Sequence, residues 1–308
     1  VPRPKPFAPD PFQLEALAAV STSDCLVTVP TGAGKTWIAE QAILRMRQEG
    51  KCSWYASPLK ALSNSKYAEF SEIFGSDNVG ILTGDRKENP DAPIIVGTTE
   101  ILRNQLYDAM HQGVSLSTDF VVLDEAHFLG DADRGVVWEE TLIYLPSRIP
   151  ILMLSATIGN AAQIADWLST IRKRICVVVE EKTRPVPLFP VFFHPSGTLY
   201  PLLSHPPLRE HKNTRLHKKV VDYVTHKHPL VLAPPNKLPP FGQILRVLKK
   251  YRLLPALFFL KSRSDCDTAL SLCSSNRLQD GERKEKLVQR IETLVSQSPY
   301  VSQHRQRW

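Results

Sequence analysis

The residues Pro30–Thr36 read P-T-G-A-G-K-T and stand between an apolar, strand-like run and a helical pattern. The two glycines permit positive φ, so successive backbone N–H groups can point at phosphate oxygens, and the following helix adds its dipole. Lys35 would neutralise the β and γ phosphates, and the Thr36 hydroxyl would bind Mg²⁺. The first glycine of the strict P-loop pattern is absent, because Val29 or Pro30 stands there. We expect ATP and Mg²⁺ as cofactors, with the nucleotide held by Pro30, Thr31, Gly32, Ala33, Gly34, Lys35 and Thr36.

A second set of chemical side chains, D-E-A-H, follows the apolar run Val121–Leu123. Adjacent carboxylates repel each other unless a cation lies between them or their tasks differ. Asp124 suits a magnesium ligand, and Glu125 suits the general base that orients an attacking water. Alone, such a pair is typical of a turn at a strand end, but the phosphate-binding loop earlier in the chain favours catalysis. His127 has no partner at zinc-ligand spacing, so zinc is not expected. The expected catalytic residues are Lys35, Asp124, Glu125 and His127.

The tripeptide Ser155-Ala156-Thr157 also follows an apolar run. Its two hydroxyls could hydrogen-bond to His127 and to the turn at Asp124 and Glu125, and so pass on the state of the phosphates to a neighbouring domain. On its own the tripeptide carries no information. With the two preceding segments, it makes Ser155 and Thr157 candidate coupling residues.

Short runs rich in Val and Ile alternate with amphipathic helical patterns from residue 25 to about residue 181. Such runs are typical of strands buried on both faces, and their alternation with helices implies right-handed crossovers. The expected strands are Cys25–Val29, Cys52–Ala56, Val79–Leu82, Ile94–Gly97, Phe120–Leu123, Ile151–Leu154 and Ile175–Val179. The expected helices are Lys35–Glu49, Leu59–Phe74, Glu100–Gln112, Val136–Leu145 and Ala161–Leu168. We expect an α/β fold whose parallel sheet has helices on both faces and binds ligands at the carboxyl ends of its strands.

The character of the sequence changes after residue 183. A stretch rich in proline and histidine follows, with one helix expected at Lys212–His226. After residue 240 the patterns predict helices at Phe241–Tyr251, Asp265–Cys273 and Glu282–Val295, and a strand at Leu257–Leu260. We therefore expect three parts: a first domain over residues 1–190, a basic linker or insertion over 191–240, and an incomplete second α/β domain over 241–308.

Charge is divided unevenly along the chain. Residues 1–200 carry a net charge of −5 and residues 201–308 a net charge of +12, which together give the formal +7. Such asymmetry favours contact with a polyanion, although a solvated linker with an acidic partner elsewhere is the alternative. The basic stretch Arg209–Lys227 is expected either to bind a strand or a protein partner, or to be a flexible insertion.

The 308 residues are 43% hydrophobic and 22% charged, with a mean hydropathy of −0.18, which is ordinary composition for a soluble protein of about two domains. No apolar run approaches the length of a membrane span. The five cysteines form no C-x-x-C pair, which favours a reducing compartment without disulfides or structural zinc. We expect the cytoplasm, with the nucleus as the alternative. The proline-rich start has no methionine, so we expect neither a signal peptide nor a natural N-terminus.

P-T-G-A-G-K-T, D-E-A-H and S-A-T, in this order, resemble motifs I, II and III of superfamily 2 DExH-box helicases, whose domains are RecA-like. Finer matches are similar to the Superkiller branch, whose best-known eukaryotic members are RNA exosome cofactors. These matches are Phe12-Gln13, Ser57–Asn64, Leu82–Asp85, Gly97–Arg103, the run from Asp124 to Pro146, and Arg184–Leu188. The resemblance covers residues 7–190 and returns at Pro255–Ala269, where a second RecA-like domain would start. It adds Phe12 and Gln13 to the nucleotide site, with Gln13 reading the adenine edge.

Three of the matching segments lie in loops that follow expected strands. Hydroxyls and backbone N–H groups there could hold the phosphates of a single strand without reading its bases, while Lys60 and Arg103 would add charge. The alternative is that these are ordinary loop residues. The candidates for nucleic-acid contact are Ser57, Pro58, Lys60, Thr83, Gly84, Thr98, Thr99 and Arg103.

The resemblance implies an ATP-dependent helicase or translocase, acting on RNA with 3′-to-5′ polarity. Two alternatives stay open: a nucleotide-gated module that binds nucleic acid or a partner without unwinding, and a DNA repair helicase, because no residue here clearly reads a 2′-OH. Motifs V and VI have no match, and with them the family's arginine finger is missing. Such an arginine is worth about 10³–10⁵ in rate. We therefore expect this chain to bind ATP better than it hydrolyses it.

Overall fold

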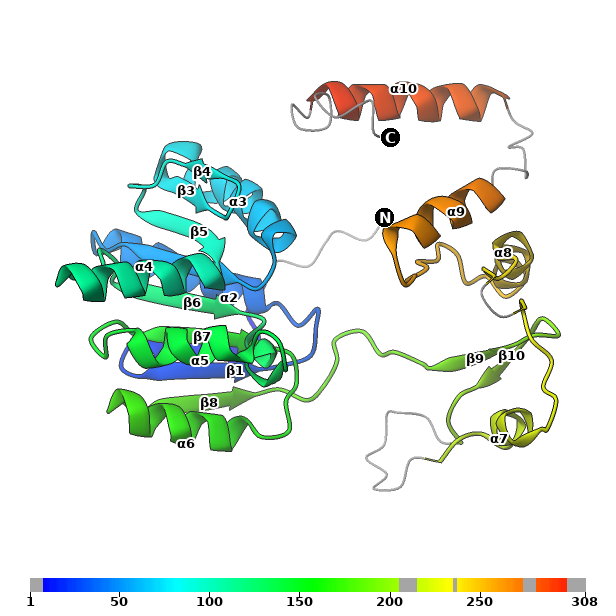
Figure 1. The fold of residues 1–308 in the computed structure, drawn as a ribbon, viewed down its shortest axis with the longest axis horizontal. Coiled ribbons are helices and arrows are strands. Elements are labelled where there is room, and N and C mark those ends of the chain that lie inside the picture. The colour runs from blue at the N-terminus through cyan, green and yellow to red at the C-terminus, as the bar shows by residue number, and fades with distance from the viewer. Residues whose placement is uncertain (1–7, 205–214, 235–236, 274–280, 298–308) are drawn as a thin grey trace. The chain divides into compact units, whose positions relative to one another are not determined.

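The computed structural model describes residues 8–204, 215–234, 237–273 and 281–297. The chain divides into two compact units, residues 1–187 and residues 188–308 (Figure 1). The finer division at residues 190 and 240 that the sequence predicts stays a prediction.

The first unit is built on a sheet whose described part has eight strands, in the order β4-β3-β5-β2-β6-β7-β1-β8. All neighbours are parallel except β3 and β4. The strands are β1 (Asp24–Thr28), β2 (Ser53–Ser57), β3 (Val79–Leu82), β4 (Lys87–Glu88), β5 (Ile94–Thr98), β6 (Phe120–Asp124), β7 (Ile151–Ser155) and β8 (Cys176–Glu180). The expected α/β fold with a parallel sheet is confirmed, and each of the seven predicted strands occurs within one or two residues of its predicted bounds.

The described part of the first unit has six α-helices and two short 3₁₀ helices, of which α1 precedes β1 and the others lie between strands (Figure 1). They are α1 (Pro11–Val20), α2 (Lys35–Gln48), α3 (Lys60–Phe74), η1 (Ser76–Asn78), α4 (Thr99–Gln112), η2 (Ala126–Gly130), α5 (Gly135–Tyr144) and α6 (Ala161–Arg172). The helix α1 and the short strand β4 were not predicted. A proline at the first turn of α1 has the φ that a helix needs there.

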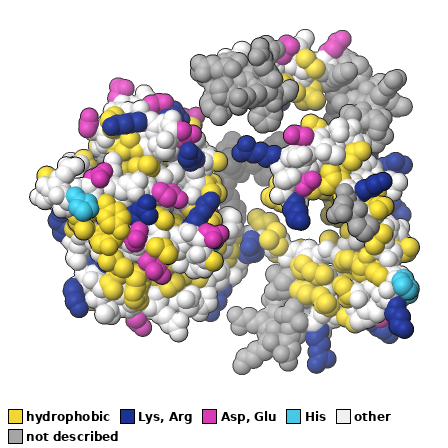
Figure 2. Space-filling view, in the orientation of Figure 1, with side chains coloured by type: hydrophobic (Ala, Val, Ile, Leu, Met, Phe, Trp, Pro, Cys, Tyr) yellow, Lys and Arg dark blue, Asp and Glu magenta, His cyan; other side chains and the backbone are white. Residues whose placement is uncertain are grey.

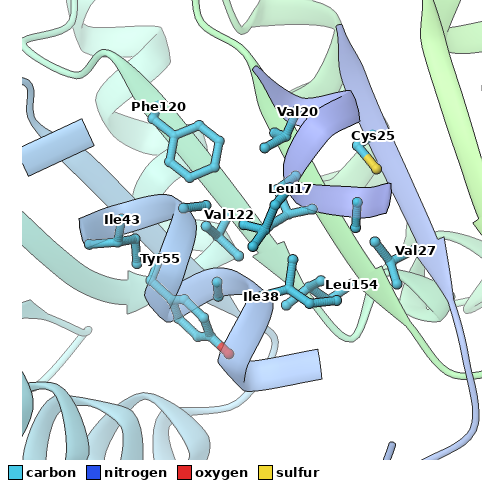
Figure 3. Packing of buried hydrophobic residues seen from close by; sticks show 14 of the residues in the cluster. Leu17, Val20, Cys25, Val27, Ile38, Ile43, Tyr55, Phe120, Val122 and Leu154 are labelled. Atoms are coloured by element: carbon cyan, nitrogen blue, oxygen red, sulfur yellow. The ribbon is translucent and has the colours of Figure 1, made fainter. Parts of the chain in front are cut away.

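Alternate residues of each central strand enter two different cores. On β6, Phe120 and Val122 pack with apolar residues of α1, α2 and α3, whereas Val121 and Leu123 pack with residues of α4, α5 and α6. Figure 3 shows part of the first cluster, with Phe120 and Val122 among side chains from the helices and neighbouring strands. Helices therefore cover both faces of the sheet, which explains why its strands read as continuous apolar runs.

One buried ion pair joins helix α6 to the start of β1, a strand inside the sheet. Nε of Arg172, at the end of α6, lies 2.7 Å from a carboxylate oxygen of Asp24 at the start of β1, and both side chains are almost fully buried. The other guanidinium nitrogens donate to the carbonyl oxygens of Leu145 and Ile149, each at 2.7 Å. The second oxygen of Asp24 accepts from the Ile151 N–H at 3.0 Å. The pair thus connects β1 and β7 to α6, because each charged group has hydrogen-bond partners inside the protein.

The second unit holds a hairpin of β9 (Val191–His194) and β10 (Thr198–Pro201), followed by α7 (Lys218–Thr225), α8 (Phe241–Lys250), α9 (Arg263–Cys273) and α10 (Gly281–Gln297). Its small apolar cluster contains the buried residues Phe241, Ile244 and Ala269. The hairpin was not predicted. Of the helix predicted at residues 212–226, the structure forms only α7. The first three residues of the predicted range lie outside the described part.

The strand predicted at Leu257–Leu260 is wrong. These residues have no regular secondary structure, and Leu257 and Phe259 are 86% and 91% exposed. A strand needs a neighbour to satisfy its backbone groups, and none pairs with this segment among the described residues. None of the helices in the described ranges is long and apolar enough to cross a membrane.

Candidate functional site

The phosphate-binding segment lies between β1 and α2, as predicted. Gly32 and Gly34 both have φ of +87°. The positive φ favours glycine at residue 34, and a Cβ there would lie 2.6 Å from the Gln13 side-chain nitrogen, so the Gln13 amide would have to shift. The segment ends where α2 begins at Lys35, which places the helix N-terminus directly behind the loop. This arrangement fits a phosphate group, because the first N–H groups of a helix have no partner within the helix and the helix dipole favours an anion there.

Gln13 connects α1 to the phosphate-binding segment through hydrogen bonds that the sequence did not predict. The Gln13 side chain is buried, accepts a hydrogen bond from the Asp10 N–H at 2.8 Å and donates to the Gly34 carbonyl oxygen at 3.1 Å. Both ends of its amide are therefore bonded within the protein. Phe12 is buried in the core of the first unit, which limits it to an indirect role at a nucleotide site.

The Lys35 ammonium points back along its own loop and donates to the Val29 carbonyl oxygen at 3.3 Å. Burial lowers the pKa of Lys35, an effect that the nearby carboxylates of Glu125 and Asp124 oppose and Arg184 reinforces. The two predicted segments thus lie near each other at the carboxyl edge of the sheet, although they follow different strands. A partly desolvated lysine near two acids suits the binding of a phosphate group.

The D-E-A-H segment lies at the carboxyl end of β6. One Asp124 oxygen accepts from the hydroxyl of the buried Tyr55 at 2.5 Å, and the other accepts from the Glu125 N–H at 3.0 Å. Glu125 has a φ of 59°, in the left-handed region, so the chain turns sharply after the strand. A Glu125 carboxylate oxygen lies 3.3 Å from Nδ1 of His127. The backbone therefore separates the two acids, with Asp124 held by the sheet and Glu125 presented by the turn.

The hydroxyl of Thr36, a predicted magnesium ligand, has a partner that the sequence did not predict. Nζ of Lys66, on α3, donates to it at 3.0 Å and also lies 2.6 Å from a carboxylate oxygen of Glu69. Nothing in the spacing of the sequence singles out Lys66 or Tyr55. Both become visible only when α3 and β2 are placed beside α2 and β6.

The hydrogen bonds expected from Ser155 are absent. Ser155 ends β7, and its hydroxyl is fully buried with no hydrogen-bond partner among the described residues, while Thr157 is exposed. Thr28 makes the connection instead: its hydroxyl donates to the Ala156 carbonyl oxygen at 3.2 Å and accepts from the Ile158 N–H at 3.1 Å. The phosphate-binding strand and the S-A-T segment are therefore joined through Thr28.

Some predicted nucleic-acid contacts lie together on the loops of the first unit. Nζ of Lys60 lies 3.2 Å from a carboxylate oxygen of Asp85, which also accepts from the Thr83 hydroxyl at 2.9 Å. A Cβ at Gly84 would lie 3.5 Å from the Lys60 nitrogen. The two hydrogen bonds to Thr83 and Lys60 lower the pKa of Asp85. Lys60 is more than half exposed, so its charge can reach an anion in solvent.

Other predicted contacts are turned inward. Ser57 is buried and its hydroxyl is 2.8 Å from that of Ser63, while Thr98 and Thr99 are buried at the start of α4. Because these three side chains are buried, their hydroxyls are not open to a nucleic-acid strand in this arrangement. Arg103 is paired with Glu140, at 3.2 Å.

Pro58 is buried, and Arg134, which was not predicted, reaches its carbonyl oxygen at 3.1 Å. Arg134 lies between η2 and α5, so this bond ties the segment after D-E-A-H to the segment after β2. No group of three or more His, Cys, Asp or Glu side chains able to hold a metal ion occurs within the described ranges.

The sequence matches known helicases over most of its length. The family model for the DEAD/DEAH box helicase matches residues 10–164. The probable helicase HelY of Mycobacterium tuberculosis is 36% identical over 93% of this chain and 33% of HelY. The chloroplastic DExH-box ATP-dependent RNA helicase DExH15 of Arabidopsis thaliana is 35% identical over 91% of this chain and 27% of its own.

Superkiller complex protein 2 of Homo sapiens is also 35% identical, over 91% of this chain and 23% of its own length. The chain thus spans between about a quarter and a third of these relatives. The matched family residues include the phosphate-binding segment, D-E-A-H and S-A-T. The chain therefore belongs to the DEAD/DEAH box helicase family.

Proposed function

We propose that this chain is the ATP-binding part of a helicase that moves along RNA in the 3′-to-5′ direction and hydrolyses ATP with Mg²⁺. One observation carries the proposal: the loop that ends at Lys35 follows β1, and the acids Asp124 and Glu125 stand at the end of β6, so all three residues lie at the carboxyl edge of one parallel sheet. An ammonium and two separated carboxylates at the carboxyl edge of a parallel sheet match the needs of phosphoanhydride hydrolysis.

The residues present fit a magnesium ion. The Thr36 hydroxyl and an Asp124 carboxylate oxygen are hard oxygen donors, and Asp124 has no cationic partner within the described residues. When bound, Mg²⁺ would neutralise charge on the terminal phosphates. Lys35 would bind the same phosphates, and Glu125 would accept the proton of the attacking water. His127 would hold Glu125 through the 3.3 Å contact.

The proposal is tested with Lys35→Ala and Glu125→Gln in the whole protein. We expect Lys35→Ala to lose nucleotide binding by titration calorimetry, because it removes the ammonium of the phosphate-binding loop. We expect Glu125→Gln to keep binding and to lose at least about 100-fold in turnover, since the amide preserves shape but cannot accept the proton.

Lys87→Ala and Glu72→Gln are matched controls, because they make the same changes at exposed positions on β4 and α3. Wild-type nucleotide affinity in Lys35→Ala would overturn the nucleotide site. Turnover of Glu125→Gln within about twofold of wild type would assign the base to another residue.

The choice of RNA is supported by the name of DExH15, an ATP-dependent RNA helicase, and by the exposed Lys60 beside Thr83 and Gly84. We expect unwinding of RNA duplexes with a 3′ overhang, and a Lys60→Ala variant that binds the strand more weakly with a smaller salt dependence. Unwinding of DNA duplexes alone would support a DNA repair helicase. Nucleotide-dependent binding without unwinding would support a binding module.

A further inference from the structure

A polar cluster lies between α2 and α3, behind the phosphate-binding loop. It consists of Thr36 and Glu40 on α2 and Lys66 and Glu69 on α3. Nζ of Lys66 stands between two partners, 3.0 Å from the Thr36 hydroxyl oxygen and 2.6 Å from a Glu69 carboxylate oxygen. The Lys66 side chain is only 17% exposed. An ammonium this well enclosed is held in place by both contacts, unlike a lysine on the surface.

The contact with Thr36 conflicts with metal binding at the same oxygen. The ammonium that donates to this hydroxyl lies within about 3 Å of its oxygen, and a divalent cation bound by the hydroxyl would also lie within about 3 Å of it. Two cations this close repel each other strongly in a partly buried site. The Thr36 oxygen therefore serves Lys66 or a metal ion, and the ammonium must move when the metal arrives.

Glu69 can keep the Lys66 ammonium paired after it leaves the Thr36 hydroxyl. Its carboxylate already contacts Lys66, and it lies three residues further along the same helix. Glu40 adds negative charge nearby: burial, and then the Glu69 carboxylate, raise the pKa of Glu40, while Lys66 opposes this. Two acids beside one lysine keep its ammonium close to the cluster after it leaves the hydroxyl.

We propose that Lys66 is a positioning residue for the metal site: its ammonium holds the Thr36 hydroxyl in the absence of metal, and yields it to the divalent cation while staying paired with Glu69. The proposal rests on the proposed function, because it takes Thr36 as a ligand of the nucleotide-bound metal. It gives Lys66 a task in metal binding that does not require contact with nucleotide.

The test measures Mn²⁺ affinity by electron paramagnetic resonance in the whole protein saturated with ADP, so it does not depend on turnover. Lys66→Met removes the competing ammonium and is expected to tighten Mn²⁺ binding about tenfold. Glu69→Gln removes the second partner, leaves the ammonium more firmly on Thr36, and is expected to weaken Mn²⁺ binding severalfold. Lys87→Met, a remote loss of the same charge, is expected to change nothing.

Long-range attraction between the remaining acids and Mn²⁺ could give the same signs, so a double-mutant cycle with Thr36→Ala is included. If Lys66 acts through the hydroxyl, Lys66→Met has no effect on Mn²⁺ affinity in the Thr36→Ala background. The same tenfold effect in both backgrounds, or no effect in either, would overturn the proposal. Lys66→Gln, which keeps a polar side chain without the charge, replaces Lys66→Met if the latter unfolds.

The outcome is separable from that of the proposed function. Mn²⁺ binding that requires ADP, and that is lost in Lys35→Ala, supports the nucleotide site whatever the Lys66 variants do. If wild type binds Mn²⁺ equally well without nucleotide, the proposed function fails. If Mn²⁺ binding requires ADP but the double-mutant cycle shows no coupling between Lys66 and Thr36, the proposed function stands. Only the proposal that Lys66 yields the Thr36 hydroxyl to the metal is then wrong.

Discussion

In residues 1–187 the strands place large apolar side chains between the sheet and the helices on its two faces, whereas in residues 188–308 many such side chains meet solvent. Phe70 and Phe120 are fully buried in the first unit. In the second, Leu230, Val231 and Phe259 are more than 60% exposed, and the buried apolar cluster is small. Figure 2 shows apolar side chains gathered on the visible face of the second unit.

Packing on both faces of the sheet fixes the positions of the residues that follow its strands. Lys35, Asp124 and Glu125 follow strands that are packed in this way, so their backbones are fixed before any ligand arrives. The second unit has no comparable frame among its described residues. Its exposed apolar side chains contribute little to its own stability, since they bury little area.

The strongest effect on stability should come from breaking the buried ion pair of the first unit. Arg172→Met should lower the free energy of unfolding by about 5 kcal/mol. It leaves the buried Asp24 carboxylate without its charged partner and the Leu145 and Ile149 carbonyl oxygens without donors. Arg174, at 3.3 Å from Asp24, offers only partial compensation. Hydrogen exchange of the β1 amides during denaturation would measure the loss.

Arg246→Met on α8 is the matched change in the second unit. Its guanidinium is exposed and donates within its own helix, to the Gly242 carbonyl oxygen at 3.3 Å. We expect a change within about 0.5 kcal/mol. Similar losses in the two variants would mean that the first unit is not the better ordered of the two.

A pair of identical substitutions measures burial in the two units directly. Phe70→Ala should cost about 3–5 kcal/mol, because Phe70 is fully buried and packs edge-on against Tyr55 and Phe74. Phe259→Ala, at a side chain that is 91% exposed, should cost less than about 0.5 kcal/mol. Urea denaturation of both variants checks the difference. A loss above about 2 kcal/mol in Phe259→Ala would show that this segment is buried in solution.

The sequence predicts the first unit well because its strongest signal is local. Seven strands and five helices follow from short apolar runs and helical spacing, and β1, β6 and β7 end where the chemical motifs start. The short strand β4 and the helix α1 give no such signal, since two polar residues and an evenly apolar segment show no clear period.

Contacts between distant residues are hidden from the sequence for a different reason. Asp24 and Arg172 are 148 residues apart in the sequence, and Tyr55 and Asp124 are 69 residues apart. The sequence around one residue of each pair does not indicate which residue it contacts. The motif residues Lys35, Thr36, Asp124 and Glu125 could be found from sequence, because their chemistry needs a fixed spacing from a strand end. Their supports, Tyr55 and Lys66, could not, because only the sheet order brings them near.

The weakest effect we predict is a pH dependence confined to the first unit. Burial and the Glu69 carboxylate raise the pKa of Glu40 above its ordinary value of 4.5. The folded protein therefore binds this proton more tightly than the unfolded chain, so ionised Glu40 destabilises the fold at higher pH. Glu40→Gln removes that cost. We expect it to stabilise the first unit at pH 8, with a benefit that disappears as the pH falls toward 4.5.

Glu285→Gln on α10 is the matched control, because Glu285 is exposed in the second unit. Urea denaturation at pH 5 and at pH 8 gives the sign for both variants. Glu285→Gln should change neither value, because substitutions at exposed surface positions have little effect on stability. A larger benefit of Glu40→Gln at pH 5 than at pH 8 would reverse the sign. It would mean that Lys66, and not burial, controls the ionisation of Glu40, and that the lysine is held by this carboxylate as firmly as by Glu69.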